Sequence, residues 1–364
     1  MTLDAAVQLR TATLDDTEAI RQLHERNGLG VLDSVSWRGL WDGYPFASEY
    51  RDIAIGWVLE AGDGSLVGAL GNVHMLYDLD GRALKGVIAT AWAVDRDYRG
   101  RSLQLMTAFL KQGGIDLWLN GSANPTASRV MEAMKLSRIP VAGYDVPCFW
   151  AASPRRFAKA AMTRKSVPGA GVLSWPAGMV LGTQDIVRRS GRGRITSAVS
   201  RIDSFDDRFD SFWLRLRKGP SRLRAVRTRA ALEWRFGAQH RAAQARIIVA
   251  RDGASLSGYA VLLRRQSPEL GMELYDIADL QALRDDPAIA RDLLLASIGV
   301  AREEKVDAVK IMTGAPFRRR AVDELKPYTY RLPFWQLFYK AESVELQSAL
   351  ANADAWDFSL FDTF

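Results

Sequence analysis

A basic turn with one glycine follows an apolar run in the first half of the chain. Val94 ends the apolar run, and Arg99, Gly100 and Arg101 lie in the segment after it. The spacing of apolar residues predicts a helix directly after this turn, with one apolar face: Leu103, Met106, Phe109 and Leu110. A helix start presents free backbone N–H groups and a positive dipole end, and two guanidinium groups stand beside it here. These features predict a site for a phosphate or pyrophosphate group.

Acid–base candidates are few and scattered. His74 lies in a predicted strand, and an imidazole with a pKa near 6.5 suits the removal of a proton from an amine through water. A strand histidine is more often a structural residue whose hydrogen bonds are satisfied in the core. Asp78 and Asp95 are further candidates, and the second half of the chain offers Glu273 and Asp276 on a predicted strand.

The elements that would position these residues follow a regular order. Two long strands, 66–77 and 83–94, are separated by Asp80-Gly81, which predicts a hairpin. A short strand at 115–119 follows the helix, and Asn124-Pro125 opens a further helix, since Asn is a good N-cap and Pro suits the first turn. The second half repeats this outline weakly, with a strand pair at 256–265 and 272–280 and a helix at 287–304.

This order resembles the GCN5-related N-acetyltransferases over residues 6–150. The resemblance rests on the turn Tyr98-Arg99-Gly100-Arg101-Ser102-Leu103 and on the segment from Asn124 to Met134. It implies an α/β fold with a mixed sheet and the binding of acetyl- or longer acyl-coenzyme A, without a metal. It also implies a set of cofactor-binding residues: Trp92, Val94, Arg99, Gly100, Arg101, Ser102, Leu103 and Asn124. Relatives carry a general-acid tyrosine in the second helix, where this chain has Val130 and Met131.

We expect two tandem domains of this kind, the second degenerate. The predicted boundaries are 1–150 for the coenzyme-binding domain, 151–195 for a linker and 196–364 for the second domain. In the second domain the turn after the fourth strand contains no glycine, and Asp279, Asp285 and Asp286 surround it. These carboxylates predict repulsion of a pyrophosphate.

Composition excludes several classes of protein. The chain of 364 residues has one cysteine, Cys148, and three separated histidines, which predicts neither a disulfide framework nor a metal site. No signal sequence or membrane-spanning run is apparent, so we expect a cytoplasmic protein. The net charge is +7, and basic residues concentrate between Arg155 and Arg229. They indicate either a solvated face or a surface for an anionic partner, such as an acyl carrier protein or, less favoured, a membrane; no nucleic-acid motif is present.

These observations favour an N-acyltransferase. The donor would be acyl-coenzyme A, with acyl-phosphopantetheine on a carrier protein as the alternative, and the acceptor a small-molecule or peptide amine. The aromatic residues of segment 31–50 would either wall the acceptor site or pack over the sheet. The competing hypothesis is a non-catalytic binding or scaffold protein, because the usual acid is missing and the base candidates are poor.

Overall fold

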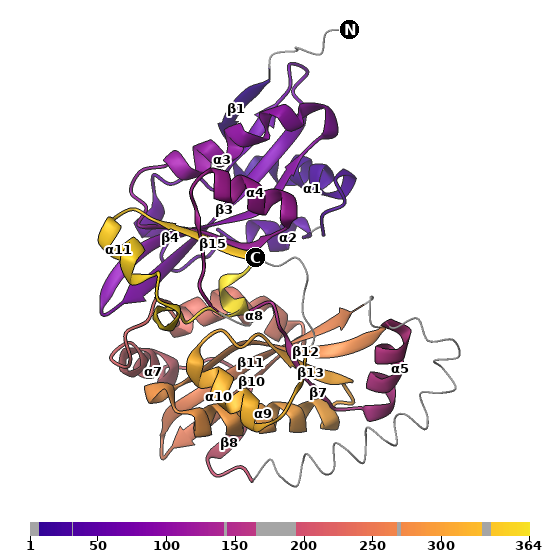
Figure 1. Ribbon diagram of the computed structural model, residues 1–364, viewed down its shortest axis with the longest axis vertical. Coiled ribbons are helices and arrows are strands. Elements are labelled where there is room, and N and C mark those ends of the chain that lie inside the picture. The colour runs from indigo at the N-terminus through magenta and orange to yellow at the C-terminus, as the bar shows by residue number, and fades with distance from the viewer. Residues whose placement is uncertain (1–6, 31, 142–143, 165–193, 268–270, 330–335) are drawn as a thin grey trace. The chain divides into compact units, whose positions relative to one another are not determined.

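The computed structural model describes residues 7–30, 32–141, 144–164, 194–267, 271–329 and 336–364 (Figure 1). The chain folds into two compact units, each built around one mixed β-sheet. Unit 1 comprises Met1–Pro140, Phe334–Asn352 and Asp362–Phe364, and unit 2 comprises Val141–Pro333 and Ala353–Phe361. The α/β fold class predicted from the sequence is confirmed.

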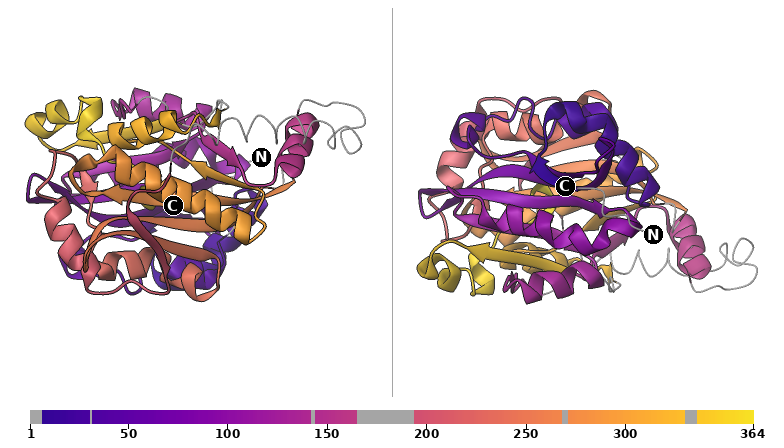
Figure 2. Two further views of the ribbon diagram at one scale, coloured as in Figure 1. Left: turned by 90° about the horizontal axis from the view of Figure 1, so that it is seen from below. Right: turned by 90° about the horizontal axis from the view of Figure 1, so that it is seen from above.

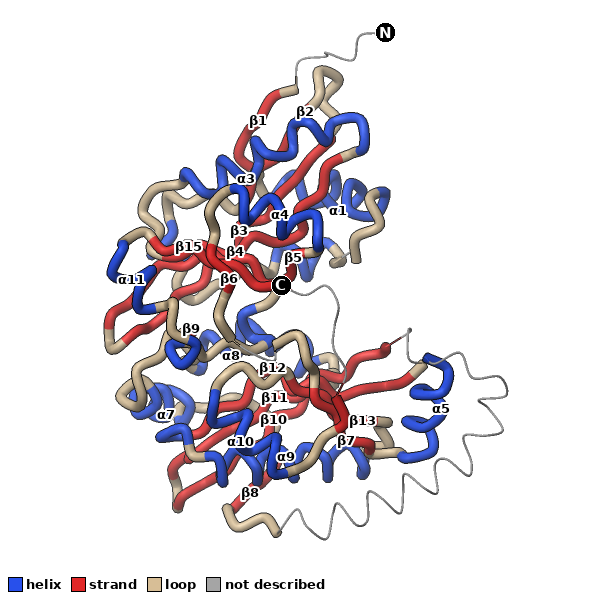
Figure 3. The backbone as a smooth tube through the Cα atoms, viewed as in Figure 1, coloured by secondary structure: helices blue, strands red, loops and turns tan. Residues whose placement is uncertain are grey.

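Unit 1 contains the predicted hairpin and the helices around it. Its helices are α1 (Thr17–Arg26), α2 (Ser34–Arg38), α3 (Ser102–Lys111), α4 (Pro125–Ala133) and α11 (Val344–Ala349). Its strands are β1 (Gln8–Thr11), β2 (Gly56–Glu60), β3 (Leu66–Leu79), β4 (Arg82–Val94), β5 (Leu117–Ala123), β6 (Ser137–Arg138) and β15 (Gln336–Ala341). The strand order is β1-β2-β3-β4-β5-β15-β6, in which β1 to β4 are antiparallel and β5 is parallel to β4 (Figure 3).

Unit 2 has the same pattern of strands. Its helices are α5 (Pro154–Arg164), α7 (Arg208–Leu216), α8 (Arg229–Arg241), α9 (Pro287–Glu303) and α10 (Pro316–Glu324). Its strands are β7 (Cys148–Ala151), β8 (Ala198–Ile202), β9 (Arg224–Ala225), β10 (Ala245–Asp252), β11 (Ser255–Ser267), β12 (Met272–Ala282), β13 (Ala308–Ile311) and β14 (Tyr328–Thr329). The sheet order is β14-β7-β13-β12-β11-β10-β8, with β13 parallel to β12, so the weak repeat in the sequence corresponds to a repeated topology.

The two units exchange strands. β7 follows unit 1 in the chain but pairs with β13 of unit 2, whereas β15 follows unit 2 in the chain but pairs with β5 and β6 of unit 1. The predicted division at residue 150 therefore differs from the compact units, because the strand that ends the first 150 residues belongs to the second sheet. The reason is physical: an apolar run identifies a strand, but it does not say which sheet edge that strand pairs with. Of the predicted linker, 165–193 lie outside the described residues.

Each central hairpin is covered by helices on both faces. In β3 a Cβ atom at Gly71 would lie 2.9 Å from the Trp37 ring of α2, while the next residue, Asn72, bonds to Gln112 at the end of α3. In β11 a Cβ at Gly258 would lie 2.7 Å from Ile289 of α9. Successive strand residues point to opposite faces, so helices pack on both sides of β3. Helix α9 contacts β10, β11 and β12 of unit 2, and Figure 2 shows the chain from two further directions.

Two kinds of feature are absent from the residues that the structure describes. No helix in these residues is long and apolar enough to cross a membrane. Within the same residues, no group of three or more His, Cys, Asp or Glu side chains could hold a metal ion.

Candidate functional site

Strands β4 and β5 of unit 1 pair over only part of their length. The parallel ladder runs from Gly86, opposite Leu117, to Ala89, opposite Asn120. Strand β4 continues to Val94, so its last five residues, 90–94, have no partner in β5; we call them the free end of β4. Main-chain groups that leave a ladder remain available to another partner. The free end of β4 contains Trp92 and Val94, two of the coenzyme-binding residues that the resemblance implies.

A bulge distorts this free end of β4. Ala69 of β3 lies opposite Ala93 and Gly71 lies opposite Thr90, so Ala91 and Trp92 face a single residue of β3. Ala91 has a φ of 50°, a left-handed conformation that is costly for any residue other than glycine, Asn or Asp. Strain of this kind, about 1–3 kcal/mol, persists where the surroundings enforce it and is common at functional sites.

The basic turn lies immediately after the bulge. A 3-10 turn, Arg96–Arg101, leads into α3, whose first residues have no side-chain cap. Arg99 and Gly100 are exposed, and no ion pair with Arg99 is found among the described residues. A Cβ atom at Gly100 would meet no protein atom within 4 Å, so neither packing nor a positive φ requires glycine here. Open space beside a glycine at a helix start is what close approach of a phosphate requires.

Helix α3 buries two residues of the apolar face predicted for it, Met106 and Phe109, but it buries Leu105 in place of Leu103. Leu105, Met106 and Phe109 are buried, whereas Leu103 is 51% exposed. The apolar pattern predicts one side of a helix surface. Which residues at the margins of that side are buried depends on where the sheet packs against the helix. Leu103 is therefore available to a ligand at the start of the helix.

Asn124 caps helix α4. Its Oδ1 accepts hydrogen bonds from the N–H groups of Thr126 (3.0 Å) and Ala127 (2.9 Å), as expected for Asn before Pro. The side chain is exposed, and this capping role uses its carbonyl oxygen. The amide N–H₂ group is compatible with the pantetheine contact implied by the resemblance.

His74 has the surroundings of a structural residue. Its ring is buried, stacks on Tyr50 at 4.6 Å and places Nε2 3.2 Å from the main-chain oxygen of Ala54. Burial lowers the pKa of His74 to about 4, so the ring is neutral at neutral pH. His74 pairs with Val87, inside the paired part of β4 and roughly 13 Å along the strand from Ala91. The structure does not bring it to the free end of β4.

The carboxylates predicted in the second half are engaged in ion pairs. Glu273 accepts hydrogen bonds from Arg264 at 2.7 and 2.8 Å, and the same guanidinium lowers its pKa. Asp276 is buried and forms an ion pair with Lys310 at 2.9 Å. Both lie on β12 of unit 2, where their ion pairs link β12 to the neighbouring strands β11 and β13. Asp95 has a comparable role in unit 1, where it binds Arg26 at 2.8 Å.

Most of the large aromatic residues of segment 31–50 belong to the core. Trp37, Trp41, Tyr44 and Tyr50 are all buried. The indole N–H of Trp41 donates to the main-chain oxygen of Asn72 at 2.9 Å. A pocket that Trp37 and Trp41 line together with sheet residues such as Gly71 has a volume of only about 10 Å³. Of the two interpretations of this segment, the structure supports packing over the sheet.

Strand β12 of unit 2 also leaves its parallel partner. Its ladder with β13 ends where Ile277 lies opposite Ile311, and β12 continues to Ala282. The buried guanidinium of Arg318 links β12 to the segment just after β13, because it donates to the main-chain oxygens of Leu280 (3.1 Å) and Thr313 (3.0 Å). The corresponding position in unit 2 is therefore filled by protein.

Arg318 belongs to a buried ionic cluster. Its other partner is Asp357, at 2.7 Å, and the surrounding guanidinium groups hold the pKa of Asp357 well below its usual range against the effect of burial. The remaining ion pairs of the cluster are Arg224–Asp357 (3.0 Å), Arg227–Asp279 (2.8 Å), Arg222–Asp285 (2.6 Å) and Arg224–Asp285 (3.3 Å). These contacts account for three arginines at the end of the basic stretch, which the sequence did not distinguish from surface residues.

The turn carboxylates of unit 2 therefore do not repel a phosphate in the way predicted. Asp279 and Asp285 are neutralised by arginines, and Asp286 caps α9 by accepting from the N–H of Ala288 at 2.8 Å. The prediction considered only the charges within the turn. The arginines that pair with Asp279 and Asp285 lie more than 50 residues away in the chain. The Arg318 side chain occupies this position between the strands, and Asp279 and Asp285 beside it are already paired with arginines.

Replacing Arg318 with alanine is expected to lower the free energy of unfolding by about 3–5 kcal/mol, since it leaves Asp357 buried without its strongest partner. Denaturant titration followed by circular dichroism measures this loss. The matched control is Arg320→Ala on the same helix, whose side chain is exposed and should change stability little. Equal effects of the two substitutions would contradict the role given to Arg318.

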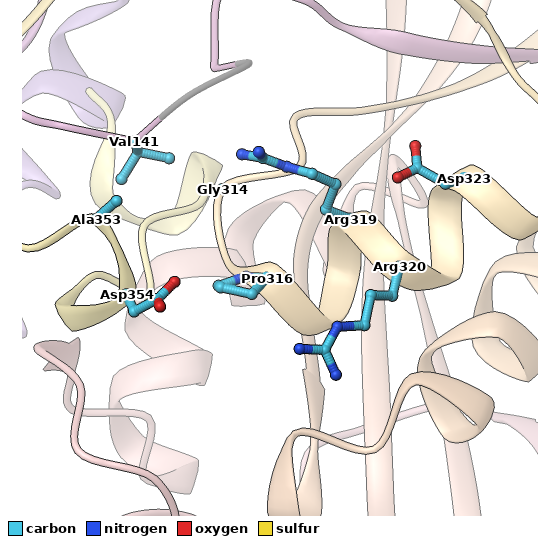
Figure 4. Close-up of a pocket in the computed structure, with 8 residues that line it drawn as sticks. All are labelled: Val141, Gly314, Pro316, Arg319, Arg320, Asp323, Ala353 and Asp354. Atoms are coloured by element: carbon cyan, nitrogen blue, oxygen red, sulfur yellow. The ribbon is translucent and has the colours of Figure 1, made fainter.

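One larger pocket, of about 230 Å³, lies in unit 2 at the start of α10 (Figure 4). Its lining residues are Val141, Gly314, Pro316, Arg319, Arg320, Asp323, Ala353 and Asp354. Basic and acidic side chains are both present, and none of the sequence-predicted site residues belongs to it.

The sequence pattern missed two residues at the free end of β4. Thr90 donates its hydroxyl to the main-chain oxygen of Phe364 at 3.1 Å, within unit 1. His24 lies 3.0 Å from the main-chain oxygen of Ala91. The contacts span 274 and 67 residues of sequence, so no local signal could have indicated them.

Comparison with known proteins supports an acyltransferase fold. No protein-family model and no curated protein sequence matches this chain. A GCN5-related N-acetyltransferase from Anabaena variabilis ATCC 29413 shares 11% identity at a TM-score of 0.55, covering 93% of this chain and 73% of that one. One from Kribbella flavida shares 15% identity at 0.55, covering 95% and 72%. Saccharomyces cerevisiae N-myristoyltransferase with bound myristoyl-CoA shares 10% identity at 0.56, covering 94% and 80%. These similarities concern the fold, and the chain has the fold of the GCN5-related N-acetyltransferases.

Proposed function

We propose that this protein is an acyl-coenzyme A-dependent N-acyltransferase with a single coenzyme site, in unit 1. The observation that carries the proposal is the contrast between two equivalent strand pairs. In unit 1 the free end of β4 is bulged and leads into a basic turn with open space at Gly100. In unit 2 the guanidinium of Arg318 fills the equivalent place.

The residues of unit 1 fit such a ligand. Arg99 and Arg101 would bind the pyrophosphate together with the first N–H groups of α3, and Gly100 would leave room for it. The buried indole N–H of Trp92 has no acceptor among the described residues, so it is a donor that a ligand could use. Asn124 would contact the pantetheine through its amide.

The reaction requires an activated acyl group, which the thioester of acyl-coenzyme A supplies. Backbone N–H groups between Trp92 and Val94 would hold the carbonyl oxygen, where charge develops as the amine attacks. An acceptor amine must lose a proton, and His74 is a poor recipient because its pKa is about 4. The acceptor class, a small-molecule or peptide amine, and an acyl carrier protein as alternative donor remain part of the proposal.

Coenzyme A and acetyl-coenzyme A are expected to raise the midpoint of thermal unfolding. A ligand at 100 times its dissociation constant adds about 2.7 kcal/mol to the free energy of unfolding. Calorimetric titration should give one coenzyme per chain. The matched control is Gly100→Val: a Cβ atom at this position meets no protein atom within 4 Å, so the unliganded midpoint should change little, while the coenzyme-induced shift should be largely lost. No shift with either ligand or with a long-chain acyl-coenzyme A would refute the proposal.

One observation favours the alternative, a binding protein without turnover. Met131, in the place of the usual acid, is fully buried, and Val130 beside it is also apolar. Release of free thiol from acetyl-coenzyme A in the presence of a panel of primary amines separates the two functions. Coenzyme binding without any amine-dependent thiol release would favour the binding protein.

A further inference from the structure

The bulge in β4 is held by the last turn of helix α1. His24 is 3% exposed, and its Nε2 lies 3.0 Å from the main-chain oxygen of Ala91. A carbonyl oxygen only accepts, so Nε2 carries the proton and donates it. Burial lowers the pKa of His24, which favours the neutral ring. The hydrogen bond thus reaches the one residue of β4 that has a left-handed conformation.

The His24 ring is itself fixed in position. It packs edge-on against Trp37 at 5.3 Å, and Trp37 packs edge-on against Trp41 at 5.2 Å. Trp41 is tied to β3 through its bond to the main-chain oxygen of Asn72. Because Trp37 packs against the His24 ring and is itself held by Trp41, the ring can fix the position of the carbonyl that it binds.

The same turn of α1 also holds the other end of the bulge. Arg26 forms an ion pair with Asp95 at 2.8 Å, and the amide of Asn27 donates to the same carboxylate at 2.7 Å. The N–H of Asp95 donates to the main-chain oxygen of Val67 on β3 at 2.8 Å. The last turn of α1 therefore fixes β4 at Ala91 and at Asp95, on either side of Trp92, Ala93 and Val94.

We propose that His24 is a positioning residue for acyl transfer. By holding the carbonyl of Ala91, it keeps the bulge in the conformation that directs the N–H groups of Trp92 to Val94 at the thioester carbonyl. This inference rests on the proposed function. It makes a separate claim, that His24 governs polarisation of the bound carbonyl more than the affinity for the coenzyme.

The variant His24→Phe removes the donor and keeps an aromatic ring against Trp37. The probe is acetyl-coenzyme A labelled with ¹³C at the thioester carbonyl, whose chemical shift on binding reports polarisation directly and needs no acceptor. We expect the bound shift of wild type to be largely lost in His24→Phe. The dissociation constant should stay within about threefold, because the pyrophosphate contacts do not depend on His24. Amine-dependent turnover should fall by about 10- to 100-fold, because a displacement of about 1 Å in the groups that position a substrate can cost up to roughly 100-fold in rate.

Two further variants separate positioning from general stability. His24→Gln places an amide N–H near the position of Nε2 and should restore most of the carbonyl shift. Ala91→Gly removes the cost of the left-handed conformation, so the bulge should no longer depend on the imidazole. The double variant His24→Phe with Ala91→Gly should therefore regain shift and turnover, and also fold if His24→Phe alone does not.

The outcomes are distinct. Full shift and turnover in folded His24→Phe, or no recovery in the double variant and in His24→Gln, would overturn the inference while leaving the proposed function intact. Wild-type protein that does not bind acetyl-coenzyme A would overturn the proposed function, and the inference with it.

Discussion

A chain that ends at residue 150 is expected to be insoluble, although it contains every predicted coenzyme-binding residue. It lacks β15, which lies between β5 and β6 in the sheet of unit 1. Phe338 and Tyr339 of this strand are almost fully buried. Without them β5 presents an unpaired edge and an uncovered apolar surface, the conditions for edge-to-edge aggregation. Expression of this fragment, with sedimentation and circular dichroism of any soluble fraction, tests the expectation.

A matched control restores β15 without unit 2. β6 and β15 are antiparallel neighbours, with Arg138 opposite Phe338, and the N–H of Ile139 donates to the main-chain oxygen of Leu337. A short glycine-containing turn from residue 140 to residue 334 should therefore form a hairpin. Residues 1–140 joined in this way to 334–352 should be more soluble than 1–150. A soluble, cooperatively folded 1–150 fragment would contradict the importance of the exchanged strand.

Local patterns predicted the elements that a short stretch of sequence determines. Asp80 and Gly81 form the turn between β3 and β4, and both have positive φ, as a tight hairpin turn requires. Helix α4 begins where Asn124-Pro125 predicted a cap. The basic turn at Arg99 follows β4 directly. Each of these predictions depends on residues within a few positions of each other, and over such distances conformational propensity and helix capping determine the local structure.

The features that the sequence did not predict depend on contacts between distant residues. Alanine in a strand gives no sign of a left-handed conformation, yet Ala91 adopts one where His24, 67 residues earlier, binds its carbonyl. Arg318 cannot be recognised as a buried residue without Asp357, because an arginine is buried only when its charge and its donors are satisfied. The strand exchange has the same origin, since apolar patterning leaves the choice of partner open.

These distant contacts change how the second half of the chain is understood. From sequence, its turn carboxylates predicted electrostatic exclusion of the coenzyme; in the structure, a packed ionic cluster occupies the strand opening. Such a cluster is costly to break but adds little stability relative to an apolar core. Introducing a glycine-containing turn would therefore not be enough to make unit 2 bind the coenzyme. Arg318 and its partners would have to be replaced together.

The double substitution Arg99→Ala with Arg101→Ala is expected to weaken coenzyme A binding by about 3–6 kcal/mol, which is more than 100-fold in the dissociation constant. Each charge-assisted contact to a phosphate contributes roughly 1.5–3 kcal/mol. Because both side chains are at least partly exposed, this contribution should fall as salt increases, and the difference between wild type and variant should narrow at high ionic strength. Isothermal titration at two salt concentrations measures both effects.

The control for this experiment is Arg284→Ala, in the corresponding turn of unit 2. Arg284 is also exposed and lies between a β-strand and a helix, as Arg99 does, but the neighbouring strand opening is filled by Arg318. Its replacement should leave the dissociation constant within about twofold, because Arg284 adjoins a strand opening that the Arg318 side chain already fills. If Arg284→Ala weakens binding and the double variant does not, the coenzyme binds to unit 2. The free end of β4 would then not be the coenzyme site, and the position next to Arg318 would be.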